Sequence, residues 1–266
     1  MKKIINEEFW LSSWDTVVVK VGSNILAGNT NWVNLDNIEN IVKWIEYLMK
    51  IGLNVFLVSS GAIAIWKNII SSESEKNEND YKNAFYSTIW QGKLIELYYK
   101  LFDERNIKIS QNLLTHNDFK DEEKINHLKE VWKYNTKTWV LAIINENDAL
   151  SKEELWFSDN DELAWLVAKS INAKVLILLS NINWIYKNYN QKDEELIEEV
   201  KEISKVLEFC EDWKSMYWRG WMQSKLNVMQ EMMNNWITWI LANWAEKDII
   251  EKIFKWEKSR KTIFRV

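Results

Sequence analysis

The chain has 266 residues, of which 47% are hydrophobic and 27% charged, and its formal net charge is −5. This is the composition of an ordinary soluble globular protein, and the acidic balance argues against a general nucleic-acid binder, which needs a basic face. No apolar run reaches the ~18 residues of a membrane span. The N-terminus, MKKIINEEFW, lacks the pattern of a secretory signal, and the single cysteine, Cys210, fits a reducing cytoplasm. We therefore predict a cytoplasmic protein with no nucleic acid and no membrane among its partners.

Apolar strand-like runs alternate with amphipathic helical segments along the chain. The predicted strands cover 16–21, 53–59, 107–114, 139–144, 174–180, 237–242 and 261–266. The predicted helices cover 34–52, 84–105, 121–135, 160–172, 193–209, 222–235 and 246–255. Such alternation is typical of a parallel-dominated sheet with helices on both faces. The expected fold is α/β, a three-layer αβα sandwich that forms a single domain over 1–266.

Short polar clusters follow four of the predicted strands. They are KVGS (20–23), SSGA (59–62), NENDA (145–149) and SNIN (180–183). Ligands of parallel sheets bind beyond the carboxyl ends of the strands. The four clusters therefore predict one binding site along a single edge of the sheet.

Each cluster also has a simpler structural interpretation. Lys20 suits a phosphate contact, with Gly22 allowing close backbone approach, but a lysine at a strand end also extends to solvent. Ser59, Ser60 and Gly61 suit an anion site at a helix N-terminus or a plain helix cap. The acceptors and amides of INENDA suit an amino-acid ammonium or carboxylate, or only a polar turn. Lys225, in the first turn of its helix, opposes the helix dipole, which favours a phosphate nearby.

Several common kinds of active site are excluded by what the sequence lacks. There is no G-x-x-x-x-G-K-[ST] motif, and therefore no P-loop. The two histidines, His116 and His127, are isolated, so neither zinc nor a nucleophilic triad is supported. What remains is two lysines, backbone amides and carboxylates, which is equipment for phosphoryl transfer by positioning and charge neutralisation.

Three residue counts are abnormal. Average usage predicts roughly 19 Gly and roughly 13 Pro, whereas the chain has 6 Gly, 0 Pro and 18 Trp. Many tryptophans stand at turns and helix ends, where glycine is preferred. Our hypothesis is that most Trp letters are glycine codons read with the wrong table, since UGA is read as glycine in some bacterial lineages. A truly Trp-rich protein is the alternative. The positions predicted to be glycine in the cell are Trp66, Trp90, Trp184, Trp218, Trp221, Trp236 and Trp244.

Five motifs together are similar to those of a known family. VVVKVGS, VSSGAIAIW, IINENDAL, FSDNDELA and WRGWMQSK stand in the order and approximate spacing of the amino acid kinase family, over about 15–266. SSGAIA and INENDA most resemble the branch that phosphorylates glutamate, and reading Trp as Gly improves the match. The resemblance implies ATP-dependent phosphorylation of the L-glutamate side-chain carboxylate to γ-glutamyl phosphate, the first step of proline biosynthesis.

The resemblance also implies roles for individual residues. It assigns catalysis to Lys20, Lys225 and Asp161, and glutamate binding to Ser60, Gly61, Asn145, Asp148 and Asn160. It assigns ATP binding to Lys20, Gly22, Ser23, Ser180, Asn181, Arg219, Gly220, Trp221, Met222, Gln223, Ser224 and Lys225. No protein side chain is assigned to a metal, since Mg2+ is carried on the ATP phosphates. The implied partners are L-glutamate, ATP, further copies of the chain in a homo-oligomer, and a downstream glutamate-5-semialdehyde dehydrogenase. The C-terminal RNA-binding-like domain of many members is not expected.

Two alternatives stay open at this point. One is another member of the same family, acting on a different carboxylate, a carbamate or a nucleoside monophosphate. The other is a non-catalytic sensor of amino acids or nucleotides on the same fold. The presence of both Lys20 and Lys225 favours an enzyme, because a sensor needs no charge that acts in a transition state.

Overall fold

The computed structural model describes residues 3–26, 33–60, 80–150, 160–180, 186–187, 195–203 and 229–265. Among the predicted site residues, Gly61, Asn181 and 219–225 lie outside these ranges. Of the tryptophans predicted to be glycine, Trp66, Trp184, Trp218 and Trp221 also lie outside them. In the described part, no helix has the length and apolar character needed to cross a membrane.

An eight-stranded sheet forms the centre of the described structure, in the order β10-β12-β11-β7-β3-β4-β6-β5. Six strands run parallel to one another, whereas β12 is antiparallel to β11, and β10 is parallel to β12. Their bounds are β3 Thr16–Val21, β4 Asn54–Ser59, β5 Ile109–Leu114, β6 Leu141–Glu146, β7 Val175–Ser180, β10 Glu199–Val200, β11 Thr238–Asn243 and β12 Lys261–Phe264. Two short pairs lie outside this sheet, β1 Ile4–Asn6 with β2 Leu11–Ser12 and β8 Tyr186–Lys187 with β9 Glu195–Leu196.

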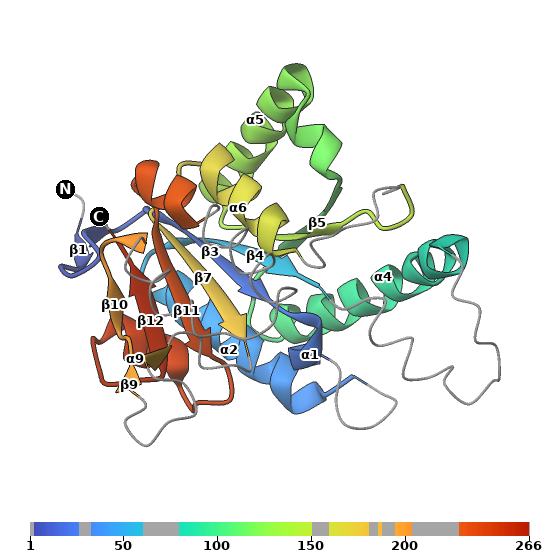
Figure 1. Ribbon diagram of the computed structural model, residues 1–266. Coiled ribbons are helices and arrows are strands. Elements are labelled where there is room, and N and C mark those ends of the chain that lie inside the picture. The colour runs from blue at the N-terminus through green and yellow to red at the C-terminus, as the bar shows by residue number, and fades with distance from the viewer. Residues whose placement is uncertain are drawn as a thin grey trace.

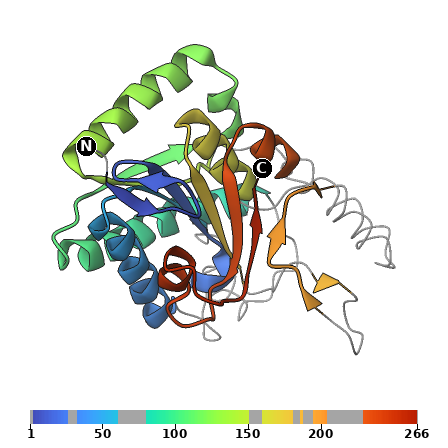
Figure 2. The ribbon, with the colours of Figure 1, turned by 90° about the vertical axis from the view of Figure 1, so that its left-hand side faces the viewer.

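Helices cover both faces of the sheet, as predicted (Figures 1 and 2). One face packs on α2 (Leu35–Lys50), α4 (Asp80–Asp103) and α9 (Ile249–Phe254), and the other on α5 (Glu122–Thr138) and α6 (Asp161–Ser170). Two shorter helices, α1 (Ser23–Leu26) and the 3-10 helix η1 (His116–Phe119), follow β3 and β5. The parallel-dominated three-layer arrangement predicted from the sequence is therefore confirmed.

The alternation of side chains along β3 explains how a lysine enters this core. Val17, Val19 and Val21 belong to the cluster packed on α2, whereas Val18 belongs to the cluster packed on α6. Because successive side chains of a strand point to opposite faces, Lys20 shares the face of Val18. The sequence pattern of β3 thus directs the ammonium group of Lys20 towards α6.

One predicted helix is wrong in its described part. Residues 193–209 are rich in Glu and Lys and favour a helix by propensity, yet β9 and β10 are strands. Ile263 N donates to Glu198 O, and the hydroxyl of Thr262 donates to Ile197 O. Pairing of β9 with β8 and of β10 with β12 therefore overrides the local preference. The second pairing buries Val200, while the charged side chain of Glu199 stays at the sheet edge.

Tryptophans in the left-handed backbone region are a prominent feature of the fold. Among the described residues eight non-glycine residues have positive φ, and five of them are tryptophans: Trp10, Trp14, Trp139, Trp236 and Trp256. All five are exposed, and Trp236, with φ 60°, is 76% exposed just after a helical segment. The positive φ predicted at Trp236 is therefore confirmed. Such backbone normally selects glycine, because a β-carbon crowds the carbonyl there.

Candidate active site

The carboxyl ends of four adjacent strands bring the predicted polar clusters to one edge of the sheet. β7, β3, β4 and β6 are neighbours, and they end at Ser180, Val21, Ser59 and Glu146. Gly22 and Ser23 follow β3, and Ser60 follows β4 with its backbone N–H donating to Val21 O. The described parts of the four clusters thus lie on the same edge, where parallel sheets bind ligands.

An ion pair between Lys20 and Asp161 lies at the centre of this edge. Lys20 Nζ is 2.7 Å from Asp161 Oδ1, with the lysine side chain 6% exposed and the aspartate side chain 26% exposed. Asp161 opens α6, where an acidic residue also favours the helix dipole. A β-carbon placed on Gly22 would lie 3.6 Å from Lys20 Nζ, an ordinary van der Waals contact, so the backbone after β3 passes close to the ammonium group. This is a nearly buried cation held in a fixed position.

Asn145, Glu146 and Asn160 form a buried amide cluster beside the ion pair. Asn160 Nδ2 donates to Asn145 Oδ1 at 2.8 Å, and both side-chain oxygens accept from the backbone N–H of Glu146. Within the part of the chain that the structure describes, Asn145 Nδ2 is buried and has no hydrogen-bond partner. A buried donor without a partner is costly, so an acceptor atom of a ligand would relieve it.

The two serines at the end of β4 are both hydrogen-bonded, but to different layers. Ser60 Oγ donates to Val21 O at 3.0 Å, which ties the predicted substrate residue to the end of β3. Ser59 Oγ lies 3.0 Å from the hydroxyl oxygen of Tyr98 on α4. Burial raises the pKa of Tyr98, so this phenol stays neutral. Both serines therefore fix the strand end before any ligand arrives.

Asp148 lies in the turn after β6 and is joined there by Gln91 of α4. Burial and the neighbouring charge of Glu146 raise the pKa of Asp148 to about 7, and a hydrogen bond with Gln91 opposes the rise. Gln91 Nε2 also donates to Glu146 O at 3.3 Å. Gln91 is not among the residues predicted from the sequence, since nothing in a helical segment distinguishes an inward-facing glutamine from an exposed one.

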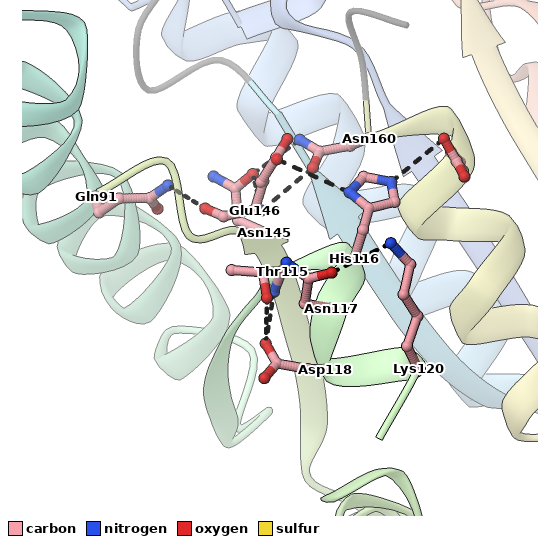
Figure 3. A network of polar contacts seen from close by, with 10 residues as sticks. Gln91, Thr115, His116, Asn117, Asp118, Lys120, Asn145, Glu146 and Asn160 are labelled. Atoms are coloured by element: carbon pink, nitrogen blue, oxygen red, sulfur yellow. Dashed lines mark hydrogen bonds and ion pairs between the residues drawn. The ribbon is translucent and has the colours of Figure 1, made fainter. Parts of the chain in front are cut away.

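A polar network around His116 connects the same turn to α6 (Figure 3). His116 Nδ1 lies 4.0 Å from Glu146 Oε1, and His116 Nε2 lies 3.4 Å from Glu162 Oε2. The hydrogen bond from His116 lowers the pKa of Glu162. This histidine is isolated in the sequence and was not predicted to belong to the site, although it follows the predicted strand 107–114 in the same way as the other clusters follow theirs.

Ser180 lies one strand away from the lysine. Its strand, β7, pairs with β3 on one side and β11 on the other, and Trp244 N donates to Ser180 O at 3.0 Å. Trp90, which is also predicted to be glycine, lies inside α4. In the described structure the indole Nε1 of Trp244 is buried without a hydrogen-bond partner. A glycine at 244 would remove that buried polar atom beside Ser180.

A separate cleft of about 740 Å³ lies at the opposite edge of the sheet. It is lined by Thr16 and Asn54, which begin β3 and β4, and by His127 and other residues of α5. None of the predicted site residues lines this cleft. The polar residues that converge at the carboxyl edge are therefore distinct from it.

Comparisons with known proteins identify related chains. A model described as the amino acid kinase family matches residues 15–242. A glutamate 5-kinase of Bacteroides thetaiotaomicron is 34% identical over 236 residues, covering 88% of this chain and 65% of the relative. A glutamate 5-kinase of Alkaliphilus oremlandii is 33% identical over 253 residues, covering 94% of this chain and 95% of the relative. The chain thus spans just under two thirds of the first relative and nearly all of the second.

Two solved structures are similar in fold. A UMP kinase from Ureaplasma parvum has a TM-score of 0.63 at 16% identity, covering 94% of this chain and 98% of that one. A carbamate kinase from Giardia lamblia has a TM-score of 0.63 at 18% identity, with the same coverage. At such identities the similarity concerns the fold, and function has to be argued from the site itself.

Proposed function

Because the chain belongs to the amino acid kinase family, we propose that it transfers the γ-phosphoryl group of ATP to the side-chain carboxylate of L-glutamate. A carboxylate oxygen of glutamate attacks the γ-phosphorus, and the bond from that phosphorus to the β,γ-bridging oxygen breaks. The products are γ-glutamyl phosphate and ADP. The two glutamate 5-kinases that match most of this chain support this choice of acceptor.

The acceptor explains why the site needs no general base. A glutamate side chain has an ordinary pKa of about 4.3 and is already ionised at neutral pH. The difficulty of the step lies in bringing an anion to a polyphosphate, so catalysis rests on positioning and on neutralising charge. The ion pair that holds Lys20 against Asp161 at the carboxyl edge is the observation that best supports the proposal. We assign Lys20 to the ATP phosphates, with Lys225 at the transferring phosphoryl group.

The amide and carboxylate groups beside the ion pair suit the rest of the amino acid. We assign the carboxylate of Asp148 to the substrate ammonium group, and the amides of Asn145 and Asn160 to substrate oxygens. The donor Asn145 Nδ2, which has no partner within the described structure, supports this assignment. Ser60 and Gly61 complete the proposed glutamate site. Gly22, Ser23, Ser180, Asn181 and 219–225 are proposed for the nucleotide.

Magnesium is expected to arrive with ATP. Hard divalent cations prefer oxygen ligands, and the Asp161 carboxylate in the described site is already paired with the ammonium group of Lys20. This arrangement fits a metal held mainly by the phosphates, and we assign it no protein ligand.

We also propose two kinds of partner. One is further copies of the chain, in a homo-oligomer. The other is a reductase such as glutamate-5-semialdehyde dehydrogenase, to which the product passes because an acyl phosphate hydrolyses readily.

An acyl-phosphate trap tests the proposed reaction. With Mg-ATP, L-glutamate and hydroxylamine, the protein should form a hydroxamate together with an equal amount of ADP. Aspartate, carbamate and UMP in place of glutamate serve as controls for other members of the family. ADP release with UMP or carbamate but not with glutamate would contradict the proposed acceptor, and no turnover with any of them would favour a sensor.

The raised pKa of Asp148 predicts a pH-dependent affinity for glutamate. The substrate ammonium group needs the ionised carboxylate, and with a pKa of about 7 the ionised form grows as pH rises. The KM for glutamate should therefore fall about tenfold from pH 6 to pH 8, the ratio that a single group titrating near 7 gives. Steady-state kinetics at saturating ATP measure this. Asp148→Asn should have a high KM at every pH, and a flat wild-type profile would remove Asp148 from the ammonium site.

A further inference from the structure

His116 stands where three elements of the candidate site meet. It opens η1 directly after β5, and its side chain is only 10% exposed. One ring nitrogen faces Glu146 at the end of β6, at 4.0 Å, and the other faces Glu162 in the first turn of α6, at 3.4 Å. The imidazole therefore lies between carboxylates of the two segments that carry the proposed glutamate-binding residues.

The backbone that carries His116 is itself fixed. The N–H and hydroxyl groups of Thr115 both donate to Asp118 Oδ2 at 2.8 Å, which closes the turn that begins η1 (Figure 3). Asn147 N donates to Leu114 O at 2.9 Å, so the turn after β6 also rests on the end of β5. His116 thus projects from a fixed turn, so the position of its ring constrains the segments that carry Glu146 and Glu162.

The charges around the ring favour a bridging role. Glu146 is 7% exposed, and a buried carboxylate requires compensation by a donor or a cation. Asp148 follows two residues later and adds a second acidic group to the same turn. On the α6 side, Glu162 interacts with His116 and also with Lys120. The ring thus faces one carboxylate in each segment, Glu162 at 3.4 Å and Glu146 at 4.0 Å.

Resting on the glutamate kinase activity proposed above, we propose that His116 is a positioning residue for the phosphoryl acceptor. By bridging Glu146 to Glu162, it holds the end of β6 with Asn145, and the following turn with Asp148, at a fixed distance from Asn160, which precedes α6. Glutamate must contact both segments at once, whereas Lys20 comes from a different strand. Loss of the bridge should therefore weaken glutamate binding much more than ATP binding.

His116→Gln, Glu162→Gln and the double variant test this bridge. In His116→Gln the KM for glutamate should rise about tenfold, within the range expected of a misplacement near 1 Å, and the KM for ATP should change less than about twofold. The double variant should be no worse than His116→Gln, because partners in one interaction are not additive. His127→Gln, which changes the other histidine at the opposite edge, should behave as wild type.

Hydrogen exchange gives a second readout that does not depend on turnover. Amides of 145–150 should exchange faster in His116→Gln than in wild type. A wild-type KM for glutamate together with wild-type exchange, or additive effects in the double variant, would overturn the bridge. If His116→Gln does not fold, Glu162→Gln decides, since that side chain is 42% exposed. If wild type forms no acyl phosphate from glutamate, the proposed function fails, and the exchange rates alone test the bridge.

Discussion

Replacing Lys20 with methionine should lower kcat by about two orders of magnitude or more, the usual loss when one preorganised charge-stabilising group is removed. The ammonium group lies 2.7 Å from Asp161 and is almost fully buried, where a charge acts more strongly than in water. Methionine keeps most of the side-chain length and removes the charge. The hydroxamate assay at saturating ATP and glutamate measures the loss, and the KM for glutamate should change little.

The same substitution also breaks an ion pair, and that effect has to be separated from catalysis. Removing one partner of a buried pair destabilises by about 3–5 kcal/mol, and the cost should be smaller here because Asp161 is partly exposed. The double variant Lys20→Met/Asp161→Asn removes the uncompensated carboxylate. It should recover thermal stability without recovering kcat. If kcat returns with stability, Lys20 acts through folding and not on phosphate.

Glycine at the five left-handed tryptophans should stabilise the protein by about 3–5 kcal/mol in total, because relief of roughly 1–2 kcal/mol of backbone strain at each residue is partly offset by lost side-chain contacts. The gains should fall short of strict additivity. The rings of Trp14 and Trp139 pack 4.9 Å apart, and Trp256 packs 5.2 Å from Phe9, so some contacts are lost. Denaturant unfolding of the protein with all five tryptophans and of the fivefold glycine variant measures the difference in the free energy of unfolding.

Trp132 provides the matched control. It has no left-handed backbone, is fully buried against Phe56, and donates from Nε1 to Asn112 Oδ1 at 2.9 Å. Trp132→Gly should destabilise by about 3–5 kcal/mol, as for other large core truncations. A fivefold variant that is no more stable than the original would show that these positions tolerate tryptophan.

Mass spectrometry of the protein from its own organism decides the identity of the residues directly. The tryptic peptide 226–247 carries Trp236, Trp239 and Trp244 together. Glycine masses at Trp236 and Trp244 would confirm the recoding hypothesis, and indole masses there would refute it. This measurement is independent of any stability effect.

The fold class could be predicted because alternation of strand and helix is a local property of the sequence. The order of the sheet could not, since nothing in TVVVKV or NVFLVS specifies which parallel strand lies beside it. The segment 193–209 shows the limit of propensity: its charged residues favour a helix, and only the backbone of β12, far along the chain, makes Glu199–Val200 a strand. The N-terminal hairpin of β1 and β2 is also too short to give a pattern.

Part of the candidate site could also be predicted from the order of strands and helices along the chain. Lys20, Ser60 and Asn145 lie at or just after the ends of predicted strands, and the rule for parallel sheets is enough to bring them to one edge. Asn160 and Asp161 begin a predicted helix, and the resemblance to the family added them. Gln91 and His116 were missed because their roles depend on contacts with Glu146, which are tertiary. His116 would have been included if the residues just after the predicted strand 107–114 had been considered together with those after the other four strands.

The position of β12 has a consequence for the order of folding. β12 pairs with β11 on one side and with β10 on the other, and among the described strands β10 has no other partner. Residues near 199 must therefore wait for residues near 263 before they can join the sheet, and such non-local pairing is slow. Until then the side of β11 that later pairs with β12 is unpaired over Trp239, Ile240 and Leu241. Unpaired strand edges of this kind promote association between chains. Late protection of 261–264 in pulsed hydrogen exchange would mark this step as the one at which refolding competes with aggregation.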